Sequence, residues 1–458
     1  MIRAVCVLLL CLAGPLSAET RVPQSAAEIS LSFAPVVRQA APAVVNIYAR
    51  RVVEQRRSPF ADDPFFRDFF RGGAGRPRVQ NSLGSGVILT ADGIVVSNYH
   101  VVGEATDIRV VLNDRREFDA RVLLGDEEAD LAILKLDGAE DLVHLPLRDS
   151  DTVEVGELVL AIGNPFGVGQ TVSSGIVSGL ARSGAATGLG RGYFIQTDAP
   201  INPGNSGGAL VDLAGRLIGV NTSILTRSGG SNGIGFAIPS ALVSAFVAQA
   251  RAGETSFRRP WAGITGQPVT ADLSDGLGLP IPSGVIIAQL HPQSPFAEAG
   301  LQPGDVVFDV DGLPVNSPQE MLFRMSIRGA GESVAIRYFR DGVTREVEVP
   351  LILPPDSPDR AEQVLSRGAV LPGLRIARIN PAVAEETGLP LMAQGVVVTD
   401  PGPYGARAGL RAGDVLRAIN GRAIRTPDDV APALERAAPR IGIEADRDGR
   451  RVLLRFRV

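Results

Sequence analysis

The sequence contains few of the residues that build disulfide frameworks, metal centres or nucleotide sites. Only two cysteines occur among 458 residues, and both lie within the first eleven positions, at Cys6 and Cys11. No paired-cysteine, His-Glu metalloprotease or glycine-rich phosphate motif stands in a suitable context. Metal and nucleotide chemistry therefore lack residues to carry them, and we expect no cofactor and no metal ligand.

Long hydrophobic runs and concentrated charge are also scarce. The apolar run from Ala4 to Ala13 is shorter than the roughly 20 residues that a membrane-spanning helix needs, and no later segment reaches that length. The chain has 45 basic and 50 acidic residues, with a net charge of -5 and no long basic tract. Because nucleic-acid binding needs a concentrated basic face, we expect neither a nucleic-acid partner nor a stable membrane span.

The first 18 residues have the layout of a secretory signal. Arg3 is followed by the apolar run and by small residues that end at Ala18, after which we expect cleavage. The exported chain would then carry no thiol. A lipid anchor at Cys11 is the less favoured alternative, because Leu10 stands where a lipoprotein signal prefers a small residue.

The length suggests about three domains, and the first of them has the pattern of a mainly β fold. Between about residues 82 and 239, short β-branched runs alternate with Gly and Asn/Asp turns, which is typical of a sandwich or of barrels. A helix is predicted from Ser240, as N-cap, to just before Gly253. The predicted strands include Gly86–Leu89, Ile94–Val96, Ile108–Leu112, Leu131–Leu134, Leu158–Ile162 and Leu217–Val220.

The remainder of the chain contains one module twice. The run Ala299–Val307 recurs as Ala408–Leu416, and both copies contain the pattern Ala-Gly-Leu-x-x-Gly-Asp. This turn is more typical of a scaffold than of a site, because its aspartate can accept bonds from nearby backbone. The proline-rich run Pro354–Pro358 between the copies is typical of an extended linker.

Residues from Arg51 to Gln80 differ from their surroundings. They combine several arginines with five phenylalanines and a glycine-rich end, and they predict a long loop. Loops of this length are usually functional or disordered. The phenylalanines favour a docking loop, and a partly ordered excursion with no role is the alternative.

The most informative stretch is Gly204-Asn205-Ser206-Gly207-Gly208. A serine bracketed by glycines can sit on a tight turn with its hydroxyl exposed, while the backbone N–H groups of Gly204 and Ser206 form an oxyanion hole. The same pattern also occurs in ordinary turns. Chemistry therefore requires a base to take the proton of Ser206.

Three histidines are candidates for that base. His291 lies in the repeated module, and His144 fits a half-buried residue at the edge of a strand. His100 follows the strand that ends at Ser97, where its ring can project into a cleft, so His100 is the better candidate. Asp130 directly precedes an apolar strand and is placed to be half-buried, as a carboxylate that orients the imidazole must be.

The order His100, Asp130, Ser206 is the order found on chymotrypsin-like double β-barrels. Together with these three residues, five motifs make the chain resemble the HtrA/Deg family of secreted serine proteases (peptidase Do type). They are Ser97–Val102, Asp130–Lys135, Ala161–Gly167, Gln196–Gly208 and Gly233–Pro239. Ser97 replaces a common threonine and Pro200 replaces a common small residue; neither change removes a catalytic group.

The resemblance implies a chymotrypsin-like protease domain over residues 19–255, followed by two α+β PDZ domains over residues 256–352 and 369–458, with a linker over 353–368. It implies an ATP-independent serine endopeptidase of the periplasm that degrades unfolded or damaged envelope proteins. Gly204, Asn205 and Ser206 would form the oxyanion hole. A chaperone that binds peptides, with the barrels mainly as scaffold, is the alternative, and a purely structural oligomer is a third.

Further roles follow only from the resemblance. The segment Ser32–Val37 would help to join three subunits, so the partners would include other copies of the chain in a trimer or a multiple of trimers. The loop 51–80 would reach a neighbouring active site. Arg182 would belong to an activation-sensing loop, and Ile201 with the loop 221–235 would shape a pocket for small aliphatic side chains.

The resemblance also assigns a peptide site. Trp261, Ala262, Gly263 and Ile264 match the PDZ loop whose N–H groups capture a peptide C-terminus while the peptide pairs as an added strand. A packing role for Trp261 is the alternative. The second module begins with Leu371-Pro372-Gly373-Leu374, and because Pro372 lacks an N–H we expect weaker or no peptide capture there.

Overall fold

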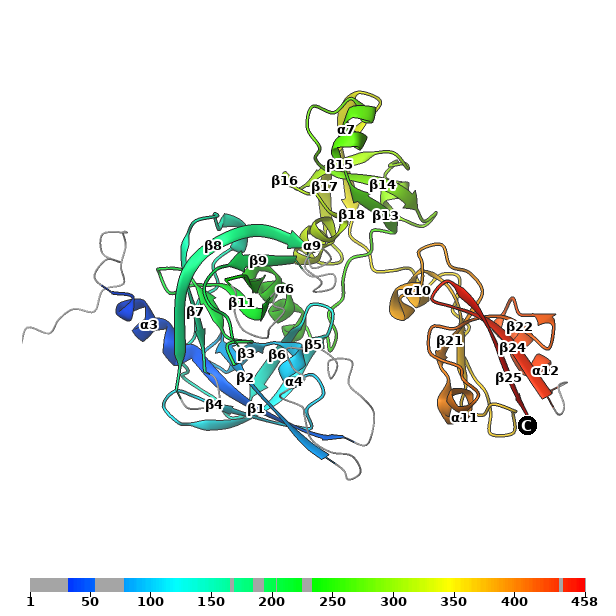
Figure 1. The fold of residues 1–458 in the computed structure, drawn as a ribbon, viewed down its shortest axis with the longest axis horizontal. Helices are drawn as coiled ribbons and strands as arrows, with labels where there is room; N and C mark the ends of the chain where they lie inside the picture. The colour runs from blue at the N-terminus through cyan, green and yellow to red at the C-terminus, as the bar shows by residue number, and fades with distance from the viewer. Residues whose placement is uncertain are drawn as a thin grey trace, which may run out of the picture. The chain divides into compact units, whose positions relative to one another are not determined.

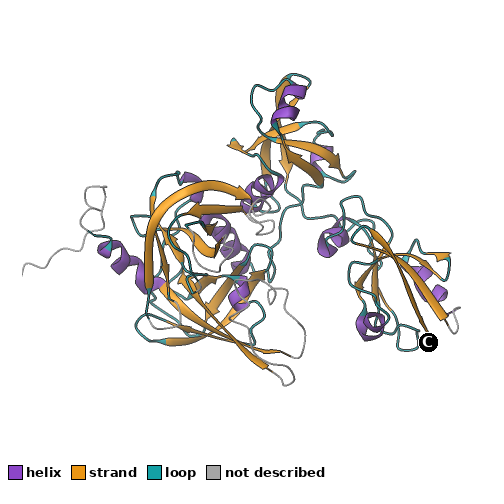
Figure 2. Cartoon of the chain, in the orientation of Figure 1, coloured by secondary structure: helices purple, strands orange, loops and turns teal. Residues whose placement is uncertain are grey.

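The computed structural model describes residues 32–53, 78–164, 169–183, 193–202, 204–224, 233–435 and 440–457. The chain divides into two compact units, the first ending at Phe257 and the second beginning at Arg258. Strands dominate both units (Figure 2). The proposed signal, residues 1–18, lies outside the described residues. None of the helices in the described ranges is both long and apolar enough to span a bilayer.

The first unit contains two closed six-stranded barrels (Figure 1). Both barrels are antiparallel, and the predicted mainly β, double-barrel fold is confirmed. In spatial order, the first barrel consists of β1 (Val44–Val53), β2 (Arg78–Ile88), β3 (Ile94–Ser97), β6 (Leu131–Leu136), β5 (Glu117–Asp126) and β4 (Asp107–Val111). The second consists of β10 (Ala209–Val211), β11 (Leu217–Ile224), β12 (Gly235–Pro239), β9 (Tyr193–Thr197), β8 (Thr171–Ser183) and β7 (Leu158–Gly163).

Burial along the strands explains why these segments pair as they do. In β4, buried and exposed residues alternate, because successive side chains of a strand point to opposite faces. β12 is buried throughout, as expected for a strand covered on both faces. All six predicted apolar runs lie in or overlap strands of these barrels.

Short helices complete the first unit, and they are α3 (Ala34–Ala40), η1 (Ala41–Ala43), α4 (Tyr99–Val102), η3 (Ser150–Thr152) and α6 (Ser240–Arg251). The predicted cap of α6 was wrong by one residue: Pro239 is the N-cap, and the Ser240 hydroxyl donates to the backbone oxygen of Arg148. The side chain is thus used in a tertiary contact, which local sequence cannot reveal.

Two further expectations need correction. The loop predicted over residues 51–80 is shorter at both ends, because β1 and β2 remain paired as far as Val53 and Arg78. Residues 54–77 lie outside the described part. His144 is exposed and lies in irregular structure, not half-buried at a strand edge; its Nδ1 contacts the backbone oxygen of Leu142 at 3.1 Å.

The second unit contains two mixed α and β modules, each built around an antiparallel sheet (Figure 1). We call the part that holds the sheet β13 to β18 the first module and the part that holds the sheet β19 to β25 the second module. The strands of the first module follow the order β13 (Ile264–Pro268), β14 (Val285–Leu290), β15 (Val306–Val310), β17 (Ser333–Arg340) and β18 (Val343–Pro350), and β16 (Leu313–Pro314) pairs with β15. Its helices are α7 (Ala271–Leu277), α8 (Pro295–Glu298) and α9 (Pro318–Arg328).

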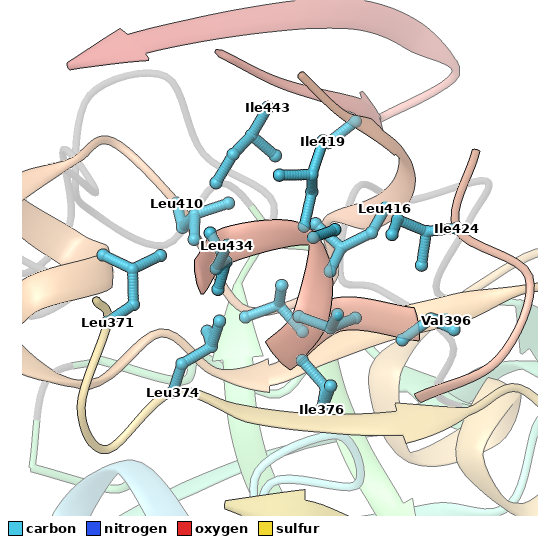
Figure 3. Close-up of a cluster of buried hydrophobic side chains, with 14 of the residues drawn as sticks. Leu371, Leu374, Ile376, Val396, Leu410, Leu416, Ile419, Ile424, Leu434 and Ile443 are labelled. Atoms are coloured by element: carbon cyan, nitrogen blue, oxygen red, sulfur yellow. The ribbon is translucent and has the colours of Figure 1, made fainter. Parts of the chain in front are cut away.

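The second module repeats this plan with one additional strand at an edge. Its strands follow the order β19 (Gln363–Val364), β20 (Arg375–Arg378), β21 (Val396–Asp400), β22 (Val415–Ile419), β24 (Arg440–Arg447), β25 (Arg450–Arg457), with β23 (Arg422–Ala423) beside β22. Its helices are α10 (Pro381–Thr387), α11 (Gly402–Arg407), η5 (Pro427–Asp429) and α12 (Val430–Glu435). Figure 3 shows the apolar core of this module, to which Leu374, Ile376 and Leu434 of α12 all contribute.

The repeated Ala-Gly-Leu-x-x-Gly-Asp turn serves as scaffold in both modules. In the first, Asp305 accepts the N–H of Gln302 at 2.7 Å and pairs with Arg340 through an Nε–Oδ1 bond of 2.6 Å. In the second, Asp414 accepts the N–H of Arg411 at 2.9 Å and pairs with Nε and Nη2 of Arg447, each at 2.7 Å. The aspartates are buried, so each turn depends on its arginine.

Candidate active site

His100 is positioned by the short helix α4, which directly follows β3. The sequence suggested a ring at the end of a strand, whereas one residue, Asn98, separates the strand from the helix and serves as its N-cap. The Asn98 side chain donates to the backbone oxygen of Asp130 at 3.0 Å, and the backbone N–H of His100 donates to the Asp130 carboxylate at 3.0 Å. These two bonds fix α4 against the start of β6.

The imidazole of His100 is directed at the carboxylate of Asp130. Its Nδ1 lies 2.8 Å from Oδ1 and 2.9 Å from Oδ2. An ionised carboxylate only accepts, so Nδ1 carries the proton and Nε2 is left as the basic nitrogen. The Asp130 side chain is 26% exposed, which matches the predicted half-buried position. Its backbone is left-handed, with φ 52°, a conformation that Asp tolerates better than most residues.

Thr222, in β11, links the aspartate to the serine. Its side-chain hydroxyl donates to Oδ2 of Asp130 at 2.6 Å, and its backbone oxygen accepts the Ser206 hydroxyl at 2.9 Å. Thr222 lies within the range 221–235 that the resemblance assigns to the substrate pocket, and no motif predicts its contact with Asp130. Threonine is common in strands, so the local sequence does not distinguish Thr222 from other strand residues. Its role becomes visible only when the two barrels bring it next to Asp130.

Ser206 lies between the barrels and is 5% exposed. The backbone N–H of Ser85, in the first barrel, donates to the Ser206 backbone oxygen at 2.9 Å. The Ser85 hydroxyl donates to the backbone oxygen of Gly204 at 2.6 Å and accepts the N–H of Asn164 at 2.8 Å. Ser97 supports the same strand, because its hydroxyl donates to the Ser85 backbone oxygen at 2.7 Å. Ser97, which stands where a threonine is common, therefore still supplies a hydroxyl for this bond.

Glycine is required beside the serine for reasons of space. A Cβ on Gly207 would lie 2.0 Å from the Ser85 backbone oxygen, and a Cβ on Gly208 would lie 2.2 Å from that of Ile162. Gly207 also has φ 82°, which favours glycine. The glycine pattern that suggested a nucleophilic turn thus has a steric cause.

The residues expected to form the oxyanion hole lie in the same turn. Gly204 has φ 104°, and the N–H of Asn205 is used by the Asn202 backbone oxygen at 3.0 Å. The Asn205 side chain accepts the hydroxyl of Thr171 at 2.6 Å. These bonds hold the turn, with Gly204 and Ser206 on either side of Asn205; Pro203 lies outside the described residues.

Comparisons with known proteins agree on all three parts of the chain. A trypsin-like peptidase domain matches residues 84–220, and PDZ domains match residues 262–351 and 395–441. A probable periplasmic serine endoprotease, DegP-like, from Halomonas elongata is 38% identical over 437 residues, 89% of this chain and 90% of that one. The chain belongs to the HtrA-type, DegP-like serine endoproteases.

Further relatives include the periplasmic pH-dependent serine endoprotease DegQ of Escherichia coli, 38% identical over 85% of this chain and 83% of that one. Among solved structures, HtrA-type protease AlgW with a decapeptide is 41% identical, with a TM-score of 0.52 over 71% of this chain and 99% of that one. The same protease with a tripeptide gives 38% identity and a TM-score of 0.54 over 71% of this chain and 99% of that one. This HtrA-type protein is accordingly a serine endopeptidase with PDZ domains.

Other predicted residues of this endoprotease contribute to the second barrel and to the segment before the serine turn. Ile201 is buried in the core of the second barrel, next to Gly235, whose added Cβ would lie 2.9 Å from the Ile201 side chain. Arg182 lies in β8, where its backbone pairs with Phe194, and not in a loop as predicted; its side chain lies outside the described residues. Pro200 is exposed, and its backbone oxygen accepts the Ser173 hydroxyl at 2.6 Å. In the described ranges, no three His, Cys, Asp or Glu residues gather as metal ligands would.

The loop Trp261–Ile264 of the first PDZ module is held from three sides. The Trp261 N–H donates to the Ile352 backbone oxygen at 2.7 Å, and its indole packs edge-on to the His291 ring at 5.5 Å. The Ser294 hydroxyl donates to the Ala262 backbone oxygen at 2.6 Å. Burial lowers the pKa of His291, which favours a neutral ring beside the indole.

Proposed function

We propose that this HtrA-type protein is an ATP-independent endopeptidase that degrades unfolded or damaged envelope proteins, with His100, Asp130 and Ser206 as its catalytic residues. The observation that carries the proposal is the chain of bonds between these groups. His100 contacts both oxygens of Asp130, and Thr222 joins Asp130 to the Ser206 hydroxyl.

The resting hydroxyl has to turn before it can react. The Ser206 hydroxyl has one hydrogen, and it donates this hydrogen in a bond to the Thr222 backbone oxygen. When a peptide binds, the hydroxyl must therefore rotate so that it donates to Nε2 of His100. His100 then takes this proton while Oγ attacks the peptide carbonyl, and the Asp130 carboxylate stabilises the imidazolium that forms. His100 next gives the proton to the leaving amine.

The acyl-enzyme is released by the same groups. Water enters in place of the amine and attacks the acyl carbon while His100 takes its proton; the bond from the acyl carbon to Oγ then breaks, and His100 returns the proton to Ser206. The N–H groups of Gly204 and Ser206, one on each side of Asn205, would hold the oxyanion in both half-reactions. Every reactant is a peptide or water, so the chemical cycle has no step that uses ATP.

Peptide recognition and location complete the proposal. Ile201, buried in the second barrel, would shape the substrate pocket through its packing, and Arg182, in β8, would belong to the activating segment. Trp261, Ala262, Gly263 and Ile264 would receive a peptide C-terminus. The curated relatives named above are periplasmic, which supports export through cleavage after Ala18. Trimers, or multiples of them, would be the working form, with no nucleic-acid partner.

The test compares cleavage by the mature chain and by its Ser206→Ala variant. We expect the native chain to cut a permanently unfolded model protein and to leave its folded counterpart intact, and the variant to lose about 10⁴-fold or more in rate. Ser333→Ala, at an exposed serine of β17, is the matched control and should keep full activity. Mass spectrometry of the products gives the cut sites.

Full cleavage by Ser206→Ala would contradict the proposed nucleophile. If neither the native chain nor the variant cleaves while both bind unfolded protein, the protein acts as a chaperone under those conditions.

A further inference from the structure

The two PDZ modules have equivalent loops before their first common strand. Gly263 and Gly373 both have a left-handed backbone, with φ 62° and 82°. The strands that follow, β13 and β20, each carry a bulge at the same place, after Thr265 in one and after Arg375 in the other. Trp261–Ile264 therefore corresponds to Leu371-Pro372-Gly373-Leu374.

The outer edges of these equivalent strands differ. β13 is the last described strand of its sheet, so an added strand can pair with it. β20 is not at an edge, because β19 from the segment between the modules pairs with it antiparallel, Gln363 opposite Ile376 and Val364 opposite Arg375. We call residues Gln363–Leu365 the cis strand.

The cis strand ends in the loop as a bound peptide would. The Leu365 N–H donates to the Leu374 backbone oxygen at 2.9 Å, and the Leu365 backbone oxygen accepts the Gly373 N–H at 2.9 Å. A PDZ ligand adds an antiparallel strand and places its terminal oxygen at the N–H groups of this loop. We propose that the cis strand is a ligand built into the chain, and that it closes the second module to peptide C-termini.

Side chains support this assignment. Leu365 is 6% exposed and joins the apolar cluster that contains Leu371 and Leu374, the latter two seen in Figure 3. Val364 is 53% exposed, as expected for the opposite face of an added strand. Gln363 donates to the carboxylate of Asp428, in the short helix that leads into α12. The cis strand is thus held by the backbone hydrogen bonds of Leu365, by the apolar packing of its side chain and by the side-chain bond of Gln363.

The segment before the cis strand is anchored to the same module. Arg360 donates to both oxygens of Glu386 at 2.9 Å and also contacts Asp356. Its backbone oxygen accepts the Arg378 N–H at 2.7 Å. The Asn380 side chain donates to Asp356 at 2.6 Å. Residues predicted to form a linker therefore lie on the module.

This anchoring gives the cis strand an advantage over any free peptide. A segment tethered a few residues away has an effective concentration on the order of millimolar, which dilute peptide ends do not reach. Building on the proposed peptide recognition, the first module captures chain ends while the second stays closed until its cis strand withdraws. The missing N–H at Pro372 matters little to Leu365, because the Leu365 backbone oxygen uses the Gly373 N–H.

The first experiment tests docking by disulfide trapping in the full mature Ser206→Ala chain. Val364→Cys with Arg375→Cys places two cysteines directly opposite each other, in a chain without other thiols after signal removal. Val364→Cys with Arg450→Cys is the control, at an exposed position of β25 that β19 does not pair with. We expect the opposed pair to oxidise at least tenfold faster; equal rates would overturn the proposal.

The second experiment tests closure with a defined probe, the hexapeptide Arg-Ala-Glu-Gln-Val-Leu with a free carboxyl end, which has the sequence of residues 360–365. Leu365→Asp, again in the Ser206→Ala chain, is designed to release the cis strand. Hydrogen–deuterium exchange should show that the peptide slows exchange of residues 373–378 in the variant. The peptide concentration needed for half of this protection should be at least tenfold lower in the variant than in the parent. The C-terminal amide of the same peptide is the control and should protect less.

Equal protection of residues 373–378 in parent and variant would overturn the closure, as would a folded Leu365→Asp chain that the peptide leaves unprotected. The trapping rates decide the matter if Leu365→Asp unfolds the module. Neither readout depends on Ser206, so a failed protease proposal would leave both results interpretable.

Discussion

At the scale of single residues, the proposed catalytic site includes a threonine that no motif marks. Thr222 uses its hydroxyl for Asp130 and its backbone oxygen for Ser206, so one residue contacts two of the three proposed catalytic groups. The hydroxyl of Thr222 donates to a carboxylate, and a hydrogen bond to a charged group contributes about 1.5–3 kcal/mol to the stability of the fold. Thr222 is therefore a positioning residue for Asp130.

Replacing Thr222 by valine keeps the backbone oxygen and the shape but removes the hydroxyl. We expect kcat/KM for a peptide substrate to fall roughly tenfold to a hundredfold. Without this hydroxyl the Asp130 carboxylate loses a bond that holds its orientation toward His100, so the loss should fall on kcat and leave KM nearly unchanged. Thr222→Ser should restore kcat. A rise in KM with kcat unchanged would mean that the contact is only structural.

At the scale of elements, each module depends on an ion pair behind its repeated turn. Arg447, near the end of β24, donates to both oxygens of Asp414 and to the backbone oxygen of Gly409. The bonds to Asp414 raise the pKa of Arg447. Asp414 itself has no exposed surface, so the strand and the turn are joined through a fully buried carboxylate.

Replacing Arg447 by alanine leaves that carboxylate buried without its partner. We expect a loss of about 3–5 kcal/mol in the free energy of unfolding of the second module. Arg450→Ala, at an exposed position of the neighbouring strand, should change it by no more than about 0.5 kcal/mol. Urea unfolding of both variants in the Ser206→Ala chain measures the difference, and similar midpoints would contradict the role given to the pair.

The segment between the modules shows how an element is decided by its partners. Its prolines and polar residues are typical of a linker, yet residues 356–365 bond to β20, α10 and η5. The strand β19 contains only two residues and would not form without β20 beside it. Local propensity was therefore a poor guide where tertiary pairing supplied the stability.

At the scale of the whole molecule, the proposed oligomer involves the first described residues. Phe33 is the N-cap of α3 and is only partly buried within one chain, whereas Val36 of the same helix is fully buried. An aromatic side chain that remains partly exposed in the monomer fits the proposed contact with other subunits.

We expect the mature Ser206→Ala chain to have the mass of a trimer or a multiple of trimers, measured by light scattering. Adding Phe33→Asp should shift the mass toward that of one chain, because a charge would be buried at the contact. Arg38→Asp, at an exposed position of α3, is the control. A monomeric parent chain would contradict the proposed assembly, and an unchanged mass in Phe33→Asp would remove this residue from the contact.

The sequence alone was sufficient for the parts of this protein that depend on local chemistry. The glycines around Ser206 predicted a tight turn, the apolar runs predicted strands, and the repeated Ala-Gly-Leu turn predicted tandem modules. These features could be predicted because sterics, alternation and turn geometry act between residues close in the chain.

Only the tertiary structure decided which distant residues meet. Asp130 and Thr222 are 92 positions apart, and their bond exists because two barrels bring their strands together. The N-terminal end of α6, the short helix that holds His100 and the pairing of Gln363–Leu365 with the second module were decided in the same way. Such contacts depend on which strands become neighbours, and that choice is made by the packing of the whole fold.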